Sequence, residues 1–558
     1  VGVFQIESRA QMQTLPKSKP ASLDDLVVEV AIIRPGPIQG NAVHPYLRRR
    51  QGLEPVTYLH PSLEPVLRDS KGVILYQEQV MRIAIDVAGF TPAESDGFRR
   101  AMGTWRSTRE MEKLHLQFHD GCMRQPGMTE EIAEELFRQV SAFASFGFAK
   151  SHAAAFARTA YESSFLKLFY PAQFLVGLIN AQPMGFYPVE VLVNDAKRHG
   201  VGVLPVDLNA STYATVTEWI GRPGWALAGA AGDDGSHDDE TLHPGDELPG
   251  GAGIEARPRP VRASSCVIPG AAARERWTAA STTGWGVRLG LHLVKGIGEQ
   301  HAELLDAELG HGPYVSLADV VERTGLPEET IERLIRTGAL DSLGRPRREL
   351  LWQLREVIGA SRGSVSSGGS RRGTRGARGT RGTRGPAAGR PLDLRLPATE
   401  APSLPAITEP ERLGDAYAVV GLDARHQVIS LFRAALDRLG AVPNSALADR
   451  RPGPVRIGGL VVTRQHPMTA KGTVFLALED ESGMVNVTLW PDTWARLRGV
   501  VRRHALLLVD GDLQRESSVV NVIAHEVRAL TDVAERAGGP EAPAGVRQLG
   551  HAGMRRLG

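Results

Sequence analysis

SFGFAKSHAAAF, residues 145–156, places a lysine, a serine and a histidine where a short turn meets an alanine-rich segment. Ser151 is a favourable N-cap, and the chain from His152 onward contains no helix breaker before Pro171. The unpaired N–H groups and the positive dipole end of such a helix favour phosphate. The stretch therefore predicts a long helix, and its first turn, with Lys150, either binds an anion or is simply solvated.

Length, net charge and cysteine content limit the classes of protein to which this sequence can belong. A chain of 558 residues is long enough for roughly three to four domains. Its formal net charge of +2 means that any nucleic-acid-binding surface must be local. Cys122 and Cys266 stand far apart, which indicates a reducing cytoplasm and argues against structural zinc or a disulfide framework. The sequence does not begin with methionine, and we expect it to be a piece of a longer polypeptide.

Residues 1–221 are dense in helix signals. A capping box at 91–94, with a proline at the first helical position, predicts a helix that carries Arg99 and Arg100 in its last turn. Cations are favourable at a helix C-terminus for reasons of the dipole alone. Two adjacent guanidinium groups would also suit a triphosphate placed at the helix end, because guanidinium binds phosphate oxygens in pairs. From these residues alone both interpretations stay open.

Changes in composition mark the predicted segments in the middle and at the end of the chain. Residues 222–284 are rich in Gly, Pro, Asp and Ala and predict a flexible insert, and we interpret its Asp/His mixture as an acidic loop. Residues 359–408 form an Arg/Gly-rich and then Pro-rich linker, which either holds phosphate non-specifically or serves as a tether. A helical connector over 409–450 and a poorly ordered tail over 533–558 complete the predicted organisation.

Two glycine-containing hairpins lie within residues 285–358. A hydrophobic-x-Gly-hydrophobic-Gly hairpin between two helices presents backbone N–H groups to a DNA phosphate. A tight turn between helices uses glycine for steric reasons alone, so one such motif is weak evidence. Two in tandem predict a helix-hairpin-helix module that binds duplex without regard to sequence. The residues expected at the DNA are Lys295, Gly296, Ile297, Gly298 and Gly338.

Residues 451–532 predict a small barrel. Three strand candidates, a helix over 491–501 and two further strands follow one another in the order of an OB-fold, a fold that often binds single strands. Phe475, Trp490 or Trp494 would supply the stacking rings, although both tryptophans also suit packing under the helix. The expected fold is therefore multidomain and mainly α, followed by an all-β OB-fold barrel.

Six motifs occur in an order that resembles the fingers region of the bacterial family C DNA polymerases, the α subunits of the polymerase III type. The tandem hairpins and the barrel follow in the same order as in that family. The stretches at 180–201 and 410–426 are similar to the error-prone, damage-inducible branch. The six motifs are FQIES at 4–8, RPGP at 34–37, YLRRRQG at 46–52, GVILYQEQVMRIA at 72–84, FRRAMG at 98–103 and FGFAKSHAAAF at 146–156.

The resemblance assigns roles to the residues of the fingers region. It implies that four cationic or imidazole side chains contact the triphosphate of the incoming nucleotide and that an aromatic ring packs near its base or sugar. The four are Arg99, Arg100, Lys150 and His152, and the ring is Phe146. Primer–template DNA and deoxynucleotides would then be the substrates.

The resemblance also implies where the catalysis takes place. Nucleotidyl transfer uses two Mg²⁺ ions held by carboxylates, which the family supplies from a palm domain. No strand-borne cluster of this kind occurs here, because the acids of 222–284 lie in the insert and those at 479–481 are expected in a barrel turn. We expect no catalytic residue in this chain, and no polymerase activity from the chain alone.

The implied partners are a Y-family-like accessory protein and a sliding clamp, in translesion synthesis in the cytoplasm. The replicative branch carries a clamp-binding peptide, and the nearest string here, 427–432, is one residue too long and predicts a buried helix start instead. A stand-alone, non-catalytic DNA-binding protein built from the same modules is the alternative. A palm domain encoded upstream in the same frame would discriminate between the two.

Overall fold

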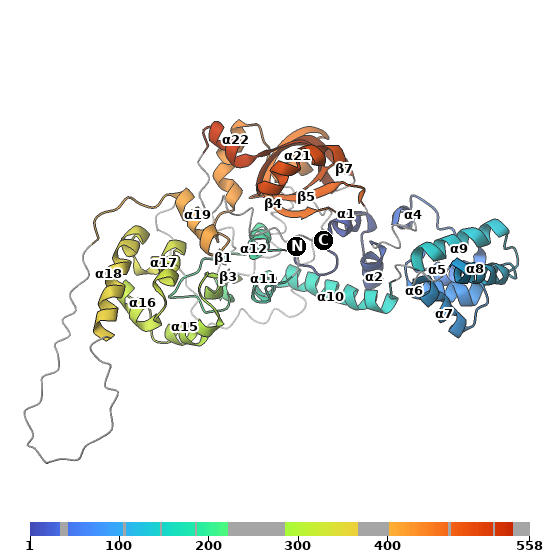
Figure 1. Cartoon of the computed structure of the whole chain (residues 1–558), viewed down its shortest axis with the longest axis horizontal. Coiled ribbons are helices and arrows are strands. Elements are labelled where there is room, and N and C mark those ends of the chain that lie inside the picture. Colours follow the sequence, from blue (N-terminus) through green and yellow to red (C-terminus); the bar gives the residue numbers. More distant parts are fainter. Residues whose placement is uncertain are drawn as a thin grey trace, which may run out of the picture.

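The structure is a computed structural model of the chain, and Figure 1 shows the arrangement of its elements. The Phe146 position, the insert 222–284, residues 366–400 of the linker and residues 540–558 of the tail lie outside the residues that it describes. The described residues are 1–33, 43–103, 108–144, 148–184, 187–220, 285–365, 401–466, 470–516 and 519–539.

In the N-terminal region the short helix α2 packs along the long helix α10 (Lys150–Phe169), and α1 packs on α2 and α4. Ala153 and Ala157 of α10 are fully buried against Val30 and Ile32, because small side chains let two helices approach closely. The short helices are α1 (Arg9–Ser18), α2 (Leu23–Ile32) and α4 (Val43–Arg50). Ser151 was expected to cap α10, but the helix begins one residue earlier, at Lys150, and Ala149 is its N-cap.

A second helical cluster forms the end of the molecule on the right of Figure 1. The predicted capping box is confirmed, since Thr91 N–H donates to Glu94 Oε2 at 2.8 Å. Phe98 and Phe118 stack at the centre of the cluster with their ring centroids 5.6 Å apart. The elements are η1 (Pro61–Leu63), α5 (Glu64–Leu67), α6 (Gln77–Arg82), the π-helical turn η2 (Ile83–Val87), α7 (Pro92–Gly103), α8 (Thr108–Cys122) and α9 (Glu130–Ala144).

One hydrophobic core joins the end of the predicted fingers region to the predicted hairpin module. Strand β3 pairs in parallel with β1, with Val287 opposite Val203, and antiparallel with β2. The segments predicted as separate domains on either side of the insert therefore share a sheet and a core. The elements are α11 (Pro171–Asn180), α12 (Val189–Arg198), β1 (Val203–Leu204), β2 (Val216–Trp219) and β3 (Trp285–Arg288).

The hairpin module continues this core with helices whose apolar faces all point inward. Ile331, Leu334 and Ile335 of α17 are fully buried, as their helical spacing requires. The elements are η5 (Leu291–Leu293), η6 (Glu299–His301), α15 (Ala302–Leu309), α16 (Leu317–Thr324), α17 (Glu328–Thr337), η7 (Asp341–Leu343) and α18 (Arg347–Val365).

The connector runs from the hairpin module to the barrel. Val428, Ile429 and Phe432 are fully buried, which confirms that the string at 427–432 is a core segment and not an exposed peptide. The elements are α19 (Glu409–Val419), η8 (Val428–Phe432), α20 (Arg433–Arg438) and η9 (Asn444–Ala448).

The C-terminal strands close into a barrel with the order β4-β5-β6-β8-β7, in which β6 and β8 are parallel and the other pairs antiparallel. This is the connectivity predicted for an OB-fold, with the helix between the third and fourth strands. The predicted fold class is thus confirmed. The elements are β4 (Gly453–Gln465), β5 (Val474–Asp480), β6 (Gly483–Leu489), α21 (Pro491–Arg503), β7 (Leu506–Glu516), β8 (Val519–Ala529) and α22 (Leu530–Arg536).

Candidate nucleotide and nucleic-acid interface

The paired arginines at the end of α7 share one carboxylate. Arg99 Nη2 lies 2.8 Å from Asp96 Oδ1, and Arg100 Nη2 binds the other oxygen of the same group. The two guanidinium groups hold the pKa of Asp96 below its usual range through hydrogen bonds, first from Arg100 and then from Arg99. Although adjacent residues on a helix diverge by about 100°, both side chains converge here on a single anionic acceptor.

The N-terminus of α10 is also occupied by acids. The Lys150 N–H lies 2.9 Å from Glu78 Oε2, and Lys150 Nζ lies 3.0 Å from Asp69 Oδ2. The helix mouth therefore binds a carboxylate, as its dipole favours. His152 is exposed and lies edge-on to Phe148, with ring centroids 5.0 Å apart. A triphosphate at this position would have to replace Glu78.

Helix α6 connects the two groups of predicted nucleotide ligands. Its first residue, Gln77, donates its N–H to Phe148 O just before α10. Further along α6, Met81 O accepts from Ser95 Oγ of α7 at 3.0 Å. The arginine pair and the α10 mouth thus belong to elements that both pack on α6.

The first predicted hairpin is packed against α17. Gly296 has φ +97°, and a Cβ there would lie 2.8 Å from both Thr330 Oγ1 and Arg333 Nη1. Arg333 Nη1 also donates to Lys295 O at 3.1 Å. The Lys295 ammonium reaches Ala418 O of α19. Glycine at this position is therefore required by packing within the protein, whether or not DNA approaches.

Two of the N–H groups of this hairpin are used inside it. Ile297 N–H donates to Val294 O at 3.0 Å. Gly298 N–H donates to His301 Nδ1 at 3.1 Å. The N–H of Gly296 has no acceptor among the residues that the structure describes, and it is the group left for a phosphate.

The second predicted hairpin forms the C-cap of α17. Gly338 has φ +83°, its N–H donates to Ile335 O at 3.0 Å, and the Ala339 N–H donates to Leu334 O at 2.9 Å. This is a glycine cap that satisfies the last carbonyls of a helix. A Cβ at Gly338 would collide with the Arg347 guanidinium. These N–H groups are engaged in the cap, and contact between Gly338 and DNA stays a prediction.

The three predicted stacking rings of the barrel have different surroundings. Phe475 on β5 is half-buried and pairs in register with Thr488 of β6. Trp494 packs partly against the barrel core, as the alternative interpretation held, and the Arg502 guanidinium lies 5.3 Å from its ring centroid. Trp490 is 53% exposed at the start of α21. It is therefore the ring most open to a base.

The barrel is joined to α12 by polar contacts that sequence reasoning missed. Arg198 Nη1 lies 2.7 Å from Glu479 Oε1, and Glu479 is fully buried. Asn194 Nδ2 donates to the other oxygen of Glu479 at 3.3 Å. Glu479 was expected in a barrel turn, but it lies buried in β5 and contacts α12. The four-residue spacing of Glu190, Asn194 and Arg198, which places polar groups on one helix face, was the signal available.

Comparison with known proteins agrees with the order of these modules. Residues 1–126 match the family model for the finger domain of the bacterial DNA polymerase III alpha subunit. Residues 256–350 match the helix-hairpin-helix motif, and residues 455–530 match the OB-fold nucleic acid binding domain. The chain is similar to the bacterial DNA polymerase III α subunit in its finger region, and it carries the hairpin and OB-fold modules after that region. The resemblance noted from the motifs is thereby confirmed.

Relatives within the family are similar along nearly the whole chain. An error-prone DNA polymerase of Corynebacterium efficiens is 40% identical over 95% of this chain and 41% of its own length. One of Mycobacterium bovis is 38% identical over 95% of this chain and 41% of its own length. One of Methylococcus capsulatus is 38% identical over 94% of this chain and 43% of its own length. The chain thus spans about two-fifths of the length of these polymerases.

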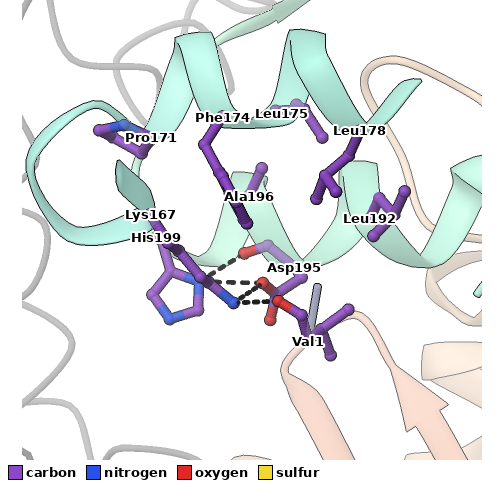
Figure 2. A pocket seen from close by; sticks show the side chains of 10 residues that line it. All are labelled: Val1, Lys167, Pro171, Phe174, Leu175, Leu178, Leu192, Asp195, Ala196 and His199. Carbon is purple, nitrogen blue, oxygen red and sulfur yellow. Dashed lines mark hydrogen bonds and ion pairs between the residues drawn. The ribbon is translucent and has the colours of Figure 1, made fainter. Parts of the chain in front are cut away.

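A small pocket lies between the end of α10 and helices α11 and α12, and Figure 2 shows its lining. Its polar side is formed by Lys167 Nζ and Asp195 Oδ2, which are 2.6 Å apart. Burial opposes the charge of Asp195, but Lys167 and the other nearby cations hold its pKa well below the usual range. Phe174 and Leu178 line the apolar side. This ion pair links α10 to α12, and Arg198 is the last residue of α12.

Among the residues that the structure describes, no group of three or more His, Cys, Asp or Glu side chains is arranged to hold a metal ion. No helix in the same part of the chain is both long and apolar enough to cross a membrane.

Proposed function

We propose that this chain is the part of an error-prone DNA-directed DNA polymerase that contacts the incoming nucleotide and the primer–template. The observation that carries the proposal is the similarity to error-prone DNA polymerases along 95% of the chain, at 37–40% identity for the relatives from Corynebacterium. The order of fingers, hairpin module and barrel supports it as well.

The nucleotide-binding role falls on the cations of the fingers region. Arg99 and Arg100 already converge on Asp96, so a triphosphate placed there would be reached by both guanidinium groups. Lys150 and His152 flank a helix mouth that holds a carboxylate in the free protein. We propose that the triphosphate exchanges with these carboxylates, and that Phe146 packs near the base or sugar.

The DNA-binding role falls on the hairpins and the barrel. The hairpins are proposed to hold the duplex part of the primer–template, and the barrel the single-stranded template. The residues proposed for these contacts are Lys295, Gly296, Ile297, Gly298, Gly338 and Phe475.

Catalysis itself is proposed to depend on a palm domain outside this chain. Mg²⁺ bound there would activate the primer 3′ oxygen and neutralise the departing pyrophosphate. The residues of this chain bind and orient the nucleotide. The 558-residue chain alone should therefore show no primer extension with Mg²⁺ and deoxynucleotides, and extension by the purified chain would overturn this assignment.

A chimera tests the nucleotide contacts. The chain is placed in the matching segment of the Corynebacterium efficiens relative, which supplies the remainder of the polymerase. Arg99→Ala or Arg100→Ala should lower kcat/KM for the nucleotide by about ten- to a hundred-fold, because each charge-assisted contact contributes roughly 1.5–3 kcal/mol. Affinity for primer–template should stay unchanged. Arg138→Ala is the matched control, since Arg138 is an exposed arginine that pairs with Glu135.

Two results of this experiment would count against the proposal. An active chimera whose arginine variants keep full kcat/KM would leave Arg99 and Arg100 as helix-end charges only. A folded chimera that binds DNA without extending a primer would favour the alternative, a non-catalytic DNA-binding protein.

The cellular role follows from the same relatives. We propose damage-induced translesion synthesis in the cytoplasm, with a Y-family-like accessory protein and a sliding clamp as partners. The test is primer extension past an abasic site by the active chimera, with an undamaged template as control. Arrest at the lesion both with and without the accessory protein would remove the translesion role.

A further inference from the structure

Helix α21 carries a row of cations on one face of the barrel. Trp494, Arg498 and Arg502 are spaced four residues apart, so they lie on the same side of the helix. Arg498 and Arg502 are exposed. The two arginines lie about 6 Å apart along the helix axis, at 1.5 Å per residue. Exposed arginines in such a row are the groups that track a phosphate backbone.

The cations of this row are not neutralised by neighbouring acids. Within the described residues, no carboxylate lies within ion-pair distance of Arg498, Arg502 or Lys471. Arg496, on another side of the same helix, pairs with Glu526 in an ion pair of 2.5 Å. Arg496 therefore has an ion-pair partner within the protein, whereas Arg498 and Arg502 have none among the described residues and can pair with a bound anion.

A further cation lies at the C-terminal end of the row. Arg464 of β4 donates from Nη2 to Val501 O in the last turn of α21. Burial and the nearby charge of Arg502 lower the pKa of Arg464 to about 10. Two guanidinium groups are thus held close enough to repel each other.

Aromatic rings accompany the cations at the other end of the row. Trp490 is 53% exposed immediately before α21 begins. The loop that bears Lys471 lies beside it, since a Cβ at Gly472 would be 3.6 Å from Pro491. An exposed ring beside a row of unpaired cations is the combination that binds single strands, where bases stack and phosphates pair.

The opposite side of the barrel is partly covered by the rest of the protein. Glu479 at the end of β5 is bound to Arg198 of α12. Val462 and Met484, on β4 and β6, pack against the core that α12 and the hairpin module share. Figure 1 shows the barrel placed over α12. The outer face of these strands is therefore only partly free for a ligand.

We propose that single-stranded nucleic acid crosses the barrel along α21, with phosphates on Arg498 and Arg502 and a base stacked on Trp490. The proposal rests on the barrel's proposed role in holding the single-stranded template, and it assigns that role to the helix face. Lys471 and Arg464 add charge at the two ends of the path.

The test measures binding of the full 558-residue chain to a labelled oligothymidylate as a function of salt. Each phosphate contact to a single strand contributes about 0.7 to the slope of log K against log salt. Arg498→Ala with Arg502→Ala should lower that slope by about 1.4 and the affinity at low salt at least tenfold. Arg496→Ala with Arg503→Ala removes the same charge from the same helix and should change the affinity by less than about twofold. Trp490→Ala should weaken binding about tenfold with little change in slope.

Photocrosslinking of an iodouracil-containing oligonucleotide provides an independent readout. The crosslink should fall on Trp490, alone or together with Phe475. Equal losses in the two arginine pairs, or a crosslink confined to Phe475, would overturn the α21 path. Failure of the polymerase assay on the chimera would not affect these binding results, so the two proposals can fail separately.

Discussion

At the scale of single residues, the predicted nucleotide ligands are already paired with acids. Arg99 and Arg100 share Asp96, and Lys150 binds Asp69. These pairs are exposed or only half-buried, so each is expected to contribute little to stability. An exposed carboxylate is also easily replaced by a triphosphate, which carries more charge. The same residues can therefore be ion-paired in the free protein and ligands in the complex.

A buried acid is a better probe of stability at this scale. Glu190 is buried in the first turn of α12 and accepts a hydrogen bond of 2.7 Å from the Tyr417 hydroxyl. Burial, reinforced by the nearby Glu479, raises the pKa of Glu190 from 4.5 to about 8. Because the folded-state value is the higher one, protonated Glu190 stabilises the protein fully below about pH 4.5. That stabilisation is lost as the pH rises towards 8.

Glu190→Gln should remove this pH dependence. The amide keeps an oxygen for Tyr417 but cannot ionise, so the variant should become more stable than the wild type as the pH rises. A pKa that moves from 4.5 to about 8 corresponds to a relative gain of roughly 3–4 kcal/mol between pH 5 and pH 8. Urea unfolding at pH 5 and pH 8 measures it. Glu112→Gln, at an exposed position on α8, should follow the wild type at both pH values. Parallel curves for wild type and Glu190→Gln would contradict the prediction.

At the scale of elements, helix ends show which caps can be predicted from adjacent residues and which cannot. The box at 91–94 closes within one turn, and the sequence predicted it correctly. The cap of α10 comes from Glu78, which lies 72 residues before Lys150 in the chain. Ser151 looked like the cap because it was the nearest suitable side chain. In the structure, the Glu78 carboxylate accepts the hydrogen bond at the start of the helix instead.

Removal of this distant cap should destabilise α10. Glu78→Ala leaves the first N–H of the helix without its carboxylate and should lower the free energy of unfolding by about 0.5–2 kcal/mol. Chemical denaturation measures the loss, with Glu112→Ala as the control at an exposed helix position. A loss no greater than in the control would show that water replaces Glu78 at no cost.

The glycine that ends α17 provides the second prediction for an element. Gly338→Ala places a Cβ against the Arg347 guanidinium in a left-handed conformation with φ +83°. The expected cost is about 1–3 kcal/mol. Gly325 also ends a helix with positive φ, at +57°, but a Cβ there meets nothing within 4 Å. Gly325→Ala should therefore cost less than Gly338→Ala in the same unfolding assay. Equal losses at both positions would show that backbone conformation alone sets the cost.

At the scale of the whole molecule, one junction fixes the barrel to the body. The ion pair between Arg198 and Glu479 is almost fully buried, and the side-chain exposures of its members are 15% and 0%. The same helix that carries Arg198 is fastened to α10 by Lys167 and Asp195. The position of the barrel relative to the fingers region therefore depends on α12.

Removal of one charged partner of the Arg198–Glu479 pair should lower the stability of the protein more than removal of both. Arg198→Met leaves Glu479 buried without its guanidinium and should cost about 3–5 kcal/mol. Arg198→Met combined with Glu479→Met should cost clearly less, because no charge is left buried. Thermal unfolding measures stability, and small-angle X-ray scattering reports whether the barrel separates from the body. A double variant that is as unstable as the single one would show that the pair itself holds the junction.

The sequence determined those features whose signals are local. Alternating apolar residues specify the strands of the barrel, a capping box starts α7, and glycine with its neighbours ends α17. The ordered motifs identified the family from the same kind of short-range information. Candidate ligands such as Arg99 and Lys150 could be named because motifs of adjacent residues carry them.

Only the tertiary structure decided which of these elements contact one another. It placed β3 beside β1 across the insert, so that two predicted domains share one core. It buried Glu479 against residues of α12, among them Asn194, 285 residues earlier in the chain. A local pattern shows that a residue is polar or apolar, but not which distant side chain will lie opposite it. That choice depends on the packing of the whole chain, because a buried charge is stable only where the fold brings a partner to it.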